Sequence, residues 1–342
     1  MTEVPSAPSE KSSVDRAHFE GCDGTALSAW QIQDAPGAPA SGSGPRPVVL
    51  MVHGNGLNGR CWLPVAEQLA SHHWRCFALD LRGHGSSGRS PGDNYDWGLF
   101  AADVALVVAE LGRRYPGAPV VGVGHSAGAS ALIIAGAGQG AALCCLWAYE
   151  PIMTVPGSDL RQARSPELAA RARRRRERFA SADEALEHFW GRGAFAEFSR
   201  DALEAYVEGG LVRAPEGDFV LACRPEDEAL VYEAAPAHDA WDVLGQLRSP
   251  LRLAGGANSP AVPPPDLEAI ATRAGATRPW VVDGLGHFGP FADAALIAAD
   301  IEDFARHAGC AGRAPDAGYS GGAPDAGRAM EPTSAMAVTG PA

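Results

Sequence analysis

A serine between two glycines is the feature of this sequence that points most directly to chemistry. The apolar run Val120 to Val123 leads into the segment Gly124-His125-Ser126-Ala127-Gly128, which is followed by small, helix-compatible residues. A strand that turns sharply into a helix holds such a serine in a strained conformation, and the flanking glycines avoid clashes at the turn. The hydroxyl then projects from the carboxyl end of the strand. We therefore predict that Ser126 is a nucleophile.

The same glycines allow a second interpretation. Gly122, Gly124 and Ala127 have the spacing of a dinucleotide-binding turn, and Glu150 lies 23 residues beyond Ala127. Such a turn normally opens its domain, whereas more than a hundred residues precede this one. Nucleotide binding is therefore the weaker interpretation, and we predict no cofactor. The histidines and cysteines lack metal-ligand spacing, so no metal site is predicted either.

A nucleophilic serine needs a general base and hydrogen-bond donors for the oxyanion. The segment 284–289 follows the last predicted strand and places His287 at the same sheet edge, on a glycine-flanked loop that we expect to be mobile. His53 is the alternative base, but its turn, His53-Gly54-Asn55-Gly56, favours a structural role. The backbone N–H groups of Asn55 and Ala127 are expected to bind the oxyanion.

These side chains need a framework, and the chain alternates between strand-like and helix-like segments. Short apolar runs separated by helical patterns are typical of a buried, mostly parallel sheet. The runs cover residues 25–32, 48–52, 75–79, 120–123, 143–148, 251–254 and 280–282. Between about residues 152 and 246 the pattern is helical and charged, which indicates an inserted cap. The arginine run 171–178 in this cap is interpreted as a solvated helix face rather than a binding patch.

Composition excludes several classes of protein. The chain has 342 residues, 46% of them hydrophobic, and a net charge of −13, which disfavours binding to nucleic acid or an anionic membrane. No apolar run approaches the ~20 residues of a membrane-spanning helix, and the first residues lack the apolar centre of a signal peptide. Seven scattered cysteines favour reduced thiols and a cytoplasmic location.

Both ends of the chain are predicted to be disordered tails. Residues 1–16 are rich in Pro, Ser and charge, and residues 309–342 are rich in Gly, Ala, Pro and Asp. Such segments cannot bury enough apolar surface to offset the entropy lost on ordering. The folded unit then consists of a core, 17–151 and 246–308, interrupted by a helical cap, 152–245.

Four segments, taken in chain order, resemble the α/β-hydrolase fold superfamily of the capped esterase, epoxide-hydrolase and dehalogenase type. They are residues 48–56, 80–87, 124–128 and 286–288, and the resemblance extends over about residues 17–308. It implies an α/β fold with an eight-stranded, mostly parallel sheet flanked by helices, and a helical cap between the sixth and seventh strands. It also implies the nucleophile and base roles of Ser126 and His287. Dehalogenases and epoxide hydrolases use an aspartate nucleophile, so a serine at position 126 argues against both.

The third member of the expected catalytic triad departs from the family pattern. The usual carboxylate follows the seventh strand, but the segment 254–260 contains no Asp or Glu, and Ser259 occupies the expected place. Some members use a carboxylate after the sixth strand instead, where this chain has Glu150. A carboxylate there could orient the imidazole of the base. We predict Glu150 as the acid, with Asp266, an unidentified acid or a Ser–His dyad as alternatives.

The predicted activity is cleavage of an ester, thioester, lactone or related acyl bond of a small-molecule substrate through an acyl-enzyme. The same residues would also support acyl transfer, and the missing carboxylate near Ser259 leaves an inactive ligand-binding protein as a further alternative. Trp62 and Phe288 are predicted to contact the substrate. No nucleic-acid or membrane partner is predicted, and the sequence makes no prediction of the oligomeric state.

Overall fold

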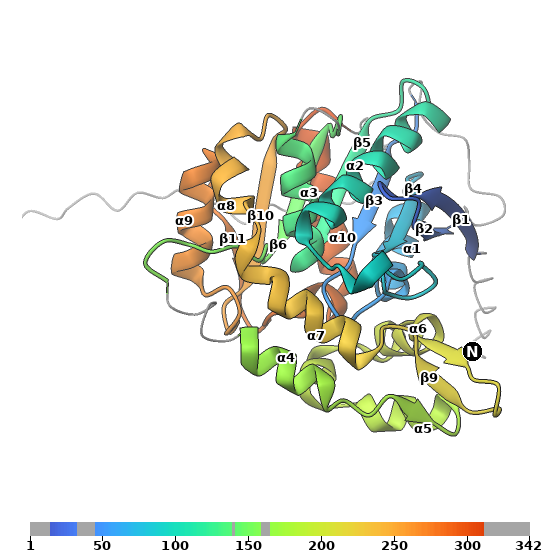
Figure 1. Cartoon of the computed structure of the whole chain (residues 1–342). Coiled ribbons are helices and arrows are strands. Elements are labelled where there is room, and N and C mark those ends of the chain that lie inside the picture. Colours follow the sequence, from blue (N-terminus) through green and yellow to red (C-terminus); the bar gives the residue numbers. More distant parts are fainter. Residues whose placement is uncertain (1–13, 33–44, 139–140, 159–164, 311–342) are drawn as a thin grey trace, which may run out of the picture.

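An eight-stranded sheet with helices on both faces forms the centre of the molecule (Figure 1). The structure is a computed structural model and describes residues 14–32, 45–138, 141–158 and 165–310. From one edge of the sheet to the other, the strands are β1 (Val14–Glu20), β2 (Ala26–Ile32), β4 (Arg75–Asp80), β3 (Val48–Val52), β5 (Val120–His125), β6 (Cys145–Tyr149), β10 (Leu251–Gly256) and β11 (Trp280–Val282).

Across the sheet from β4 to β11, each strand is parallel to the next, whereas β2 is antiparallel to both β1 and β4. Every residue of β3, β5 and β6 is buried, because helices cover both faces of the sheet. This explains why these strands appear in the sequence as continuous apolar runs rather than as alternating patterns. The expected α/β fold with an eight-stranded, mostly parallel sheet is confirmed.

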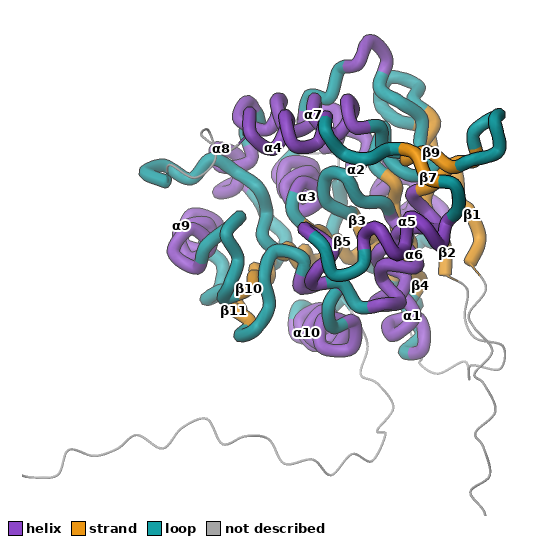
Figure 2. The backbone as a smooth tube through the Cα atoms, turned by 90° about the horizontal axis from the view of Figure 1, so that it is seen from below, coloured by secondary structure: helices purple, strands orange, loops and turns teal. Residues whose placement is uncertain are grey.

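Two hydrophobic cores lie on opposite faces of the sheet. Along β3, Leu50 belongs to the core shared with α2 and α3, whereas Met51 belongs to the core shared with α1 and α10. Figure 2 shows these two pairs of helices on opposite sides of the strands. The helices that pack on the sheet are α1 (Leu63–Ser71), α2 (Trp97–Arg114), α3 (Ala127–Ala137), α9 (Pro264–Ala274) and α10 (Ala294–His307).

The chain between β6 and β10 forms an insertion, most of which lies below the sheet in Figure 1. It contains α4 (Ser165–Arg173), α5 (Ala182–Phe189), α6 (Arg200–Gly210), α7 (Pro225–Ala234), α8 (Ala240–Val243), and the strands β7 (Arg178–Phe179), β8 (Leu211–Arg213) and β9 (Phe219–Leu221). The three strands pair in the order β7-β9-β8. The sequence analysis predicted only helices here, because strands of two or three residues are too short to produce a periodic pattern.

The arginine run of the insertion is paired with carboxylates. Arg173 bonds to Glu226 and Glu233 of α7, and Arg175 bonds to Glu228 of the same helix. These ion pairs join α4, and the turn that follows it, to α7. The interpretation of the run as a solvated helix face is therefore incomplete, since part of its charge is used within the insertion.

The predicted N-terminal tail ends too late. Strand β1 already begins at Val14, and only one of its residues is buried because it pairs with β2 alone, at the edge of the sheet. An edge strand of this kind has no hydrophobic alternation that a sequence pattern could reveal. The predicted C-terminal tail begins too early, because Gly309 and Cys310 bond to the end of the last helix and Cys310 is buried. The rest of the predicted tails, residues 1–13 and 311–342, lies outside the described part of the chain.

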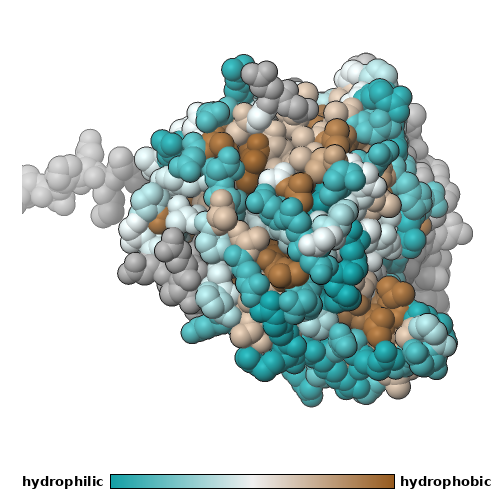
Figure 3. All heavy atoms as spheres, viewed as in Figure 1, coloured by the Kyte–Doolittle hydropathy of each residue, from teal (hydrophilic) through white to brown (hydrophobic). Residues whose placement is uncertain are grey.

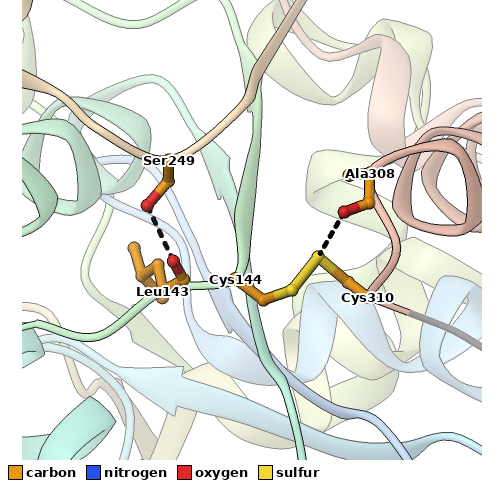
Figure 4. The surroundings of a disulfide bond; sticks show 5 residues. All are labelled: Leu143, Cys144, Ser249, Ala308 and Cys310. Atoms are coloured by element: carbon orange, nitrogen blue, oxygen red, sulfur yellow. Dashed lines mark hydrogen bonds between the residues drawn. A yellow bond between two sulfur atoms is a disulfide. The ribbon is translucent and has the colours of Figure 1, made fainter.

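A disulfide joins Cys144 to Cys310, so the prediction that all cysteines are reduced is wrong (Figure 4). The two residues are separated by 166 positions in the chain, yet their Cα atoms lie 5.8 Å apart. Cys144 immediately precedes β6 and Cys310 follows α10, so the bond ties the C-terminal helix to the sheet. The predicted cytoplasmic location loses the support that reduced thiols gave it.

Polar and apolar residues are interspersed on the face of the molecule that Figure 3 shows, where the hydrophobic patches are separated by hydrophilic side chains. Within the described residues, the exposed large hydrophobic side chains are Leu106, Leu168, Trp190, Val212 and Leu296. None of the helices in the described ranges has the length and apolar character that crossing a membrane requires.

Candidate active site

The residues of the candidate site, among them Ser259 from the position of the missing acid, follow the carboxyl ends of five neighbouring strands, β3, β5, β6, β10 and β11. Asn55 follows β3, Ser126 follows β5, and Glu150 follows β6. Ser259 lies in the loop after β10, and His287 lies in the loop after β11. Because these strands are parallel, all five residues lie at the same edge of the sheet.

Ser126 occupies the sharp turn between β5 and α3. Its φ of 55° and ψ of −122° lie outside the regions that ordinary residues adopt, and its N–H donates to the carbonyl of Tyr149 at 2.9 Å. The turn packs directly against the end of β3, since a Cβ at Gly128 would collide with the carbonyl oxygens of Val52 and His53. The glycine at position 128 is therefore required for this close approach.

Ser126, His287 and Glu150 form one hydrogen-bonded chain. The Ser126 Oγ lies 3.2 Å from Nε2 of His287, and Nδ1 of the same ring lies 2.6 Å from Oε2 of Glu150. If Nδ1 carries the ring proton and donates it to the carboxylate, Nε2 is free to accept the serine proton. Ser126 is 8% exposed and the His287 side chain 14% exposed, whereas Glu150 is fully buried.

The buried Glu150 carboxylate receives two further hydrogen bonds. The Gly256 N–H donates to Oε1 at 2.8 Å, and the Ser259 hydroxyl donates to Oε2 at 2.6 Å. Glu150 also has a positive φ of 46°, a conformation that non-glycine residues adopt mainly where tertiary structure imposes it. The alternative acid, Asp266, does not join this group, because it accepts a hydrogen bond from the Ser158 hydroxyl instead.

Two backbone N–H groups close to Ser126 are free to donate: that of Asn55, in the turn after β3, and that of Ala127, the first residue of α3. Within the described ranges, the N–H groups of Asn55 and Ala127 donate no hydrogen bond. The turn is held by its neighbours, because the Asn55 side chain donates to the carbonyl of Glu228 at 2.9 Å and the Gly56 N–H donates to Nε2 of His84 at 3.1 Å. Both predicted oxyanion donors are therefore available at this edge of the sheet.

His53, the alternative base, has a structural role in the fold. It is completely buried, and its Nδ1 donates to the Gly54 carbonyl at 2.8 Å while its Nε2 accepts the Leu81 N–H at 3.0 Å. Burial lowers the pKa of the imidazole well below its ordinary value, and the neighbouring His84 lowers it further. A ring with both nitrogens occupied cannot accept the Ser126 proton.

Two residues that the sequence analysis did not select hold the loop of His287. The Tyr149 hydroxyl donates to the Gly286 carbonyl at 2.8 Å, and Nε2 of His125 donates to the His287 carbonyl at 2.8 Å. Burial lowers the pKa of His125 well below its ordinary value, and the nearby His287 adds to this effect. The only signal in the sequence for Tyr149 and His125 was their position at the ends of the strands that precede Glu150 and Ser126. The loop is hydrogen-bonded on its carbonyl side, which differs from the mobile loop predicted.

The two residues predicted to contact substrate differ in their placement. Trp62 has no exposed surface and packs edge-on against Phe291, with ring centroids 5.1 Å apart. It is a core residue in this structure, because it ends the short helix Gly59–Trp62 directly before α1 and belongs to the hydrophobic core that α1 shares with the sheet. Phe288 is partly exposed, and its ring centroid lies 5.0 Å from that of His287, so its contact with a substrate stays a prediction.

Curated relatives match only part of the chain. The chain is 36% identical over 67 residues to a pimeloyl-acyl-carrier-protein methyl ester esterase of Aeromonas salmonicida, which is 20% of this chain and 26% of that protein. It is 40% identical over 116 residues to a non-heme haloperoxidase of Rhodococcus erythropolis, which is 33% of this chain and 40% of that protein. The matches thus span between a quarter and two fifths of these relatives.

Comparison with solved structures covers far more of the fold. An E-2-(acetamidomethylene)succinate hydrolase superposes with a TM-score of 0.70 over 86% of this chain and 100% of that one, at 20% identity. The similarity at this identity concerns the fold. The model of the alpha/beta hydrolase family matches residues 49–300, which include every strand from β4 to β11 as well as the Ser126, Glu150 and His287 group. On this match, the chain belongs to the alpha/beta hydrolase family.

Proposed function

We propose that this protein is a serine hydrolase that cleaves an ester, thioester, lactone or related acyl bond of a small molecule. The observation that carries the proposal is the continuous hydrogen-bonded chain from the Ser126 hydroxyl through His287 to the buried Glu150 carboxylate. An isolated serine hydroxyl is a weak nucleophile at neutral pH, and an adjacent oriented base is what activates it. The esterase among the partial relatives adds support at the level of reaction class.

In the first half of the proposed reaction, Ser126 Oγ bonds to the acyl carbon while its proton passes to Nε2 of His287. Glu150 keeps the imidazole in the required tautomer and stabilises the imidazolium that forms. The oxyanion that forms accepts hydrogen bonds from the N–H groups of Asn55 and Ala127. Both groups are available for this role, since neither donates to another acceptor within the described ranges. The imidazolium then gives its proton to the leaving alcohol or thiol, and the acyl group remains on Ser126.

In the second half, His287 takes a proton from water, whose oxygen bonds to the acyl carbon. Collapse of the intermediate breaks the bond to Ser126 Oγ, which regains its proton from the imidazolium. The carboxylic acid product leaves, and the resting enzyme is restored. An alcohol in place of water would give acyl transfer by the same steps.

A fluorophosphonate probe tests this proposal without knowledge of the substrate, because the probe reacts with activated serines. We expect stoichiometric labelling of the native wild-type protein at Ser126, located by peptide mapping. Ser126→Ala and urea-unfolded wild-type protein should remain unlabelled. Absence of labelling in the native protein, or equal labelling of Ser126→Ala, would contradict a serine hydrolase.

Turnover of p-nitrophenyl esters with acyl chains of increasing length provides the catalytic readout. Product analysis in the presence of methanol distinguishes hydrolysis from transfer. We expect the free acid to be the main product, and a predominantly methyl ester product would favour the acyltransferase.

A further inference from the structure

Three consecutive residues of the insertion lie against the loop that carries His287. The Phe198 ring stacks on Phe291 with centroids 5.0 Å apart and lies 5.9 Å from the ring of Phe288. The next N–H, of Ser199, donates to the Phe291 carbonyl at 2.8 Å. Glu197, the first of the three, ends the short helix Gly193–Glu197 immediately before this contact. The insertion is therefore docked on the loop through a continuous segment.

Glu197 bonds to the backbone on both sides of His287. A single carboxylate oxygen, Oε2, accepts the Gly286 N–H at 3.1 Å and the Phe288 N–H at 3.2 Å. Hydrogen bonds to an ionised acceptor are about twice as strong as neutral ones. Two such bonds from the residues before and after His287 restrict the backbone from which the imidazole projects.

The loop is thus bonded on its donor side by Glu197 and on its acceptor side by Tyr149 and His125. Tyr149 and His125 belong to the central sheet, at the ends of β6 and β5. Glu197 belongs to the insertion, and among these three side chains it is the one that carries a formal charge.

Gly286 is the residue that admits the carboxylate. A Cβ at position 286 would collide with the carboxylate of Glu197, and the three nearest atoms to that Cβ all belong to Glu197. The glycine before His287 therefore serves a close approach rather than mobility. It also makes the contact testable from the side of the loop, because alanine at position 286 would displace the carboxylate.

We propose that Glu197 is a positioning residue for His287, so that a carboxylate of the insertion sets the place of the general base. This inference rests on the proposed function, in which Nε2 of His287 must accept the proton of Ser126, 3.2 Å away. Displacement of a reacting group by about 1 Å can cost on the order of 100-fold in rate. Loss of the two Glu197 hydrogen bonds is expected to allow a shift of this kind.

The test compares Glu197→Met with Glu197→Gln. The two replacements have similar size, but only the glutamine oxygen can accept the Gly286 and Phe288 N–H groups. We expect the methionine variant to lower the fluorophosphonate labelling rate and kcat for a p-nitrophenyl ester about 10- to 100-fold, with KM changed less than about threefold. The glutamine variant should retain at least about a third of wild-type activity. Glu204→Ala is the control, since it removes a carboxylate of α6 whose partner among the described residues is the exposed Arg200.

Gly286→Ala supplies a second, independent measurement that applies even where Glu197→Met does not fold. This variant should lose activity to a similar extent because it pushes the Glu197 carboxylate aside, whereas the same change in a Glu197→Gly background should cost little further. Activities of Glu197→Met and Gly286→Ala equal to that of Glu204→Ala would overturn the proposal. Failure of the wild-type protein to label at all would instead refute the serine hydrolase itself.

Discussion

The Ser259 hydroxyl donates a hydrogen bond of 2.6 Å to Oε2 of Glu150, and this is the same oxygen that lies 2.6 Å from Nδ1 of His287. The family's usual acid position, after the seventh strand, is thus occupied by a donor that binds the carboxylate from the sixth. This arrangement is possible because β6 and β10 are adjacent and parallel, so their carboxyl ends lie side by side. The missing carboxylate near Ser259 therefore leaves no gap in the hydrogen-bonded group.

Replacement of Ser259 by alanine should weaken this group without removing it. Glu150 would keep the bonds from Gly256 and His287 but lose one of three donors, and a buried carboxylate with a missing partner costs about 1–3 kcal/mol. We expect kcat to fall about tenfold with little change in KM. Ser158→Ala is the control, since it removes a serine–carboxylate bond of the same 2.6 Å length, to Asp266, away from the site. Equal effects of the two variants on kcat would argue against a role of Ser259 in the site.

Glu150→Gln should lower kcat/KM about 10³- to 10⁴-fold, because the neutral amide no longer stabilises the imidazolium and favours the wrong tautomer. Asp266→Asn, whose side chain bonds to Ser158, should change kcat/KM less than about threefold. Steady-state kinetics with a p-nitrophenyl ester checks both. A severe loss in Asp266→Asn together with a mild one in Glu150→Gln would move the acid to Asp266.

The disulfide should stabilise the fold without contributing to activity. Cys144 directly precedes the first residue of β6, whereas Glu150 directly follows its last residue. The disulfide and the proposed chemistry therefore lie at opposite ends of this strand. Loss of a native disulfide typically costs about 2–5 kcal/mol. The double variant Cys144→Ser, Cys310→Ser should show that loss in urea unfolding while kcat stays within about twofold of the wild-type value.

Dithiothreitol serves as the control for this prediction. It should reproduce the destabilisation in the wild-type protein and have no effect on the double variant. Unfolding midpoints of the wild-type protein that are identical with and without reductant would show that the bond is not formed in solution.

Stability should decrease in acid because three histidines near the site are buried in the neutral form. Burial lowers the pKa of His53, His84 and His125 in the folded state. The unfolded chain protonates them below about pH 6.5, so it binds more protons than the folded chain there. Their contribution to stability is therefore complete above that pH and is lost as the pH falls.

Urea unfolding between pH 7.5 and 5.5 measures this effect as the slope of the free energy of unfolding against pH. His125→Gln keeps an N–H that can donate to the His287 carbonyl but removes one titrating ring. In this variant the slope of the free energy of unfolding against pH should decrease by the amount that corresponds to about one proton. An unchanged slope would mean that His125 is already protonated in the folded protein.

Local patterns were sufficient for the parts of the site that depend on local geometry. The turn around Ser126 requires glycines beside it and a strand before it, and all of these lie within ten residues. The strands of the central sheet were predictable for a similar reason, because burial on both faces demands continuous apolar runs such as Val48–Val52. His287 was identified by its glycine-flanked loop after the last strand, in the order that the family resemblance implies.

Long-range contacts were beyond the reach of these patterns. Nothing near Glu197 marks it as a partner of a loop 89 residues away, and nothing pairs Cys144 with Cys310. The expectation for Trp62 failed for the same reason, since an aromatic residue looks identical in a sequence whether it lines a pocket or fills a core. The edge strand β1 and the three short strands of the insertion also lacked a periodic signal.

The sequence by itself therefore determined the class of fold, the nucleophile turn and the two strand ends from which an acid could come. Only the tertiary structure decided that Glu150 reaches His287 while Asp266 bonds elsewhere, and that a carboxylate of the insertion bonds to the histidine loop. Residue types and periodicity encode whether a segment is buried and how it turns. Which distant side chains meet depends on the packing of adjacent strands and on the path of the insertion across their ends.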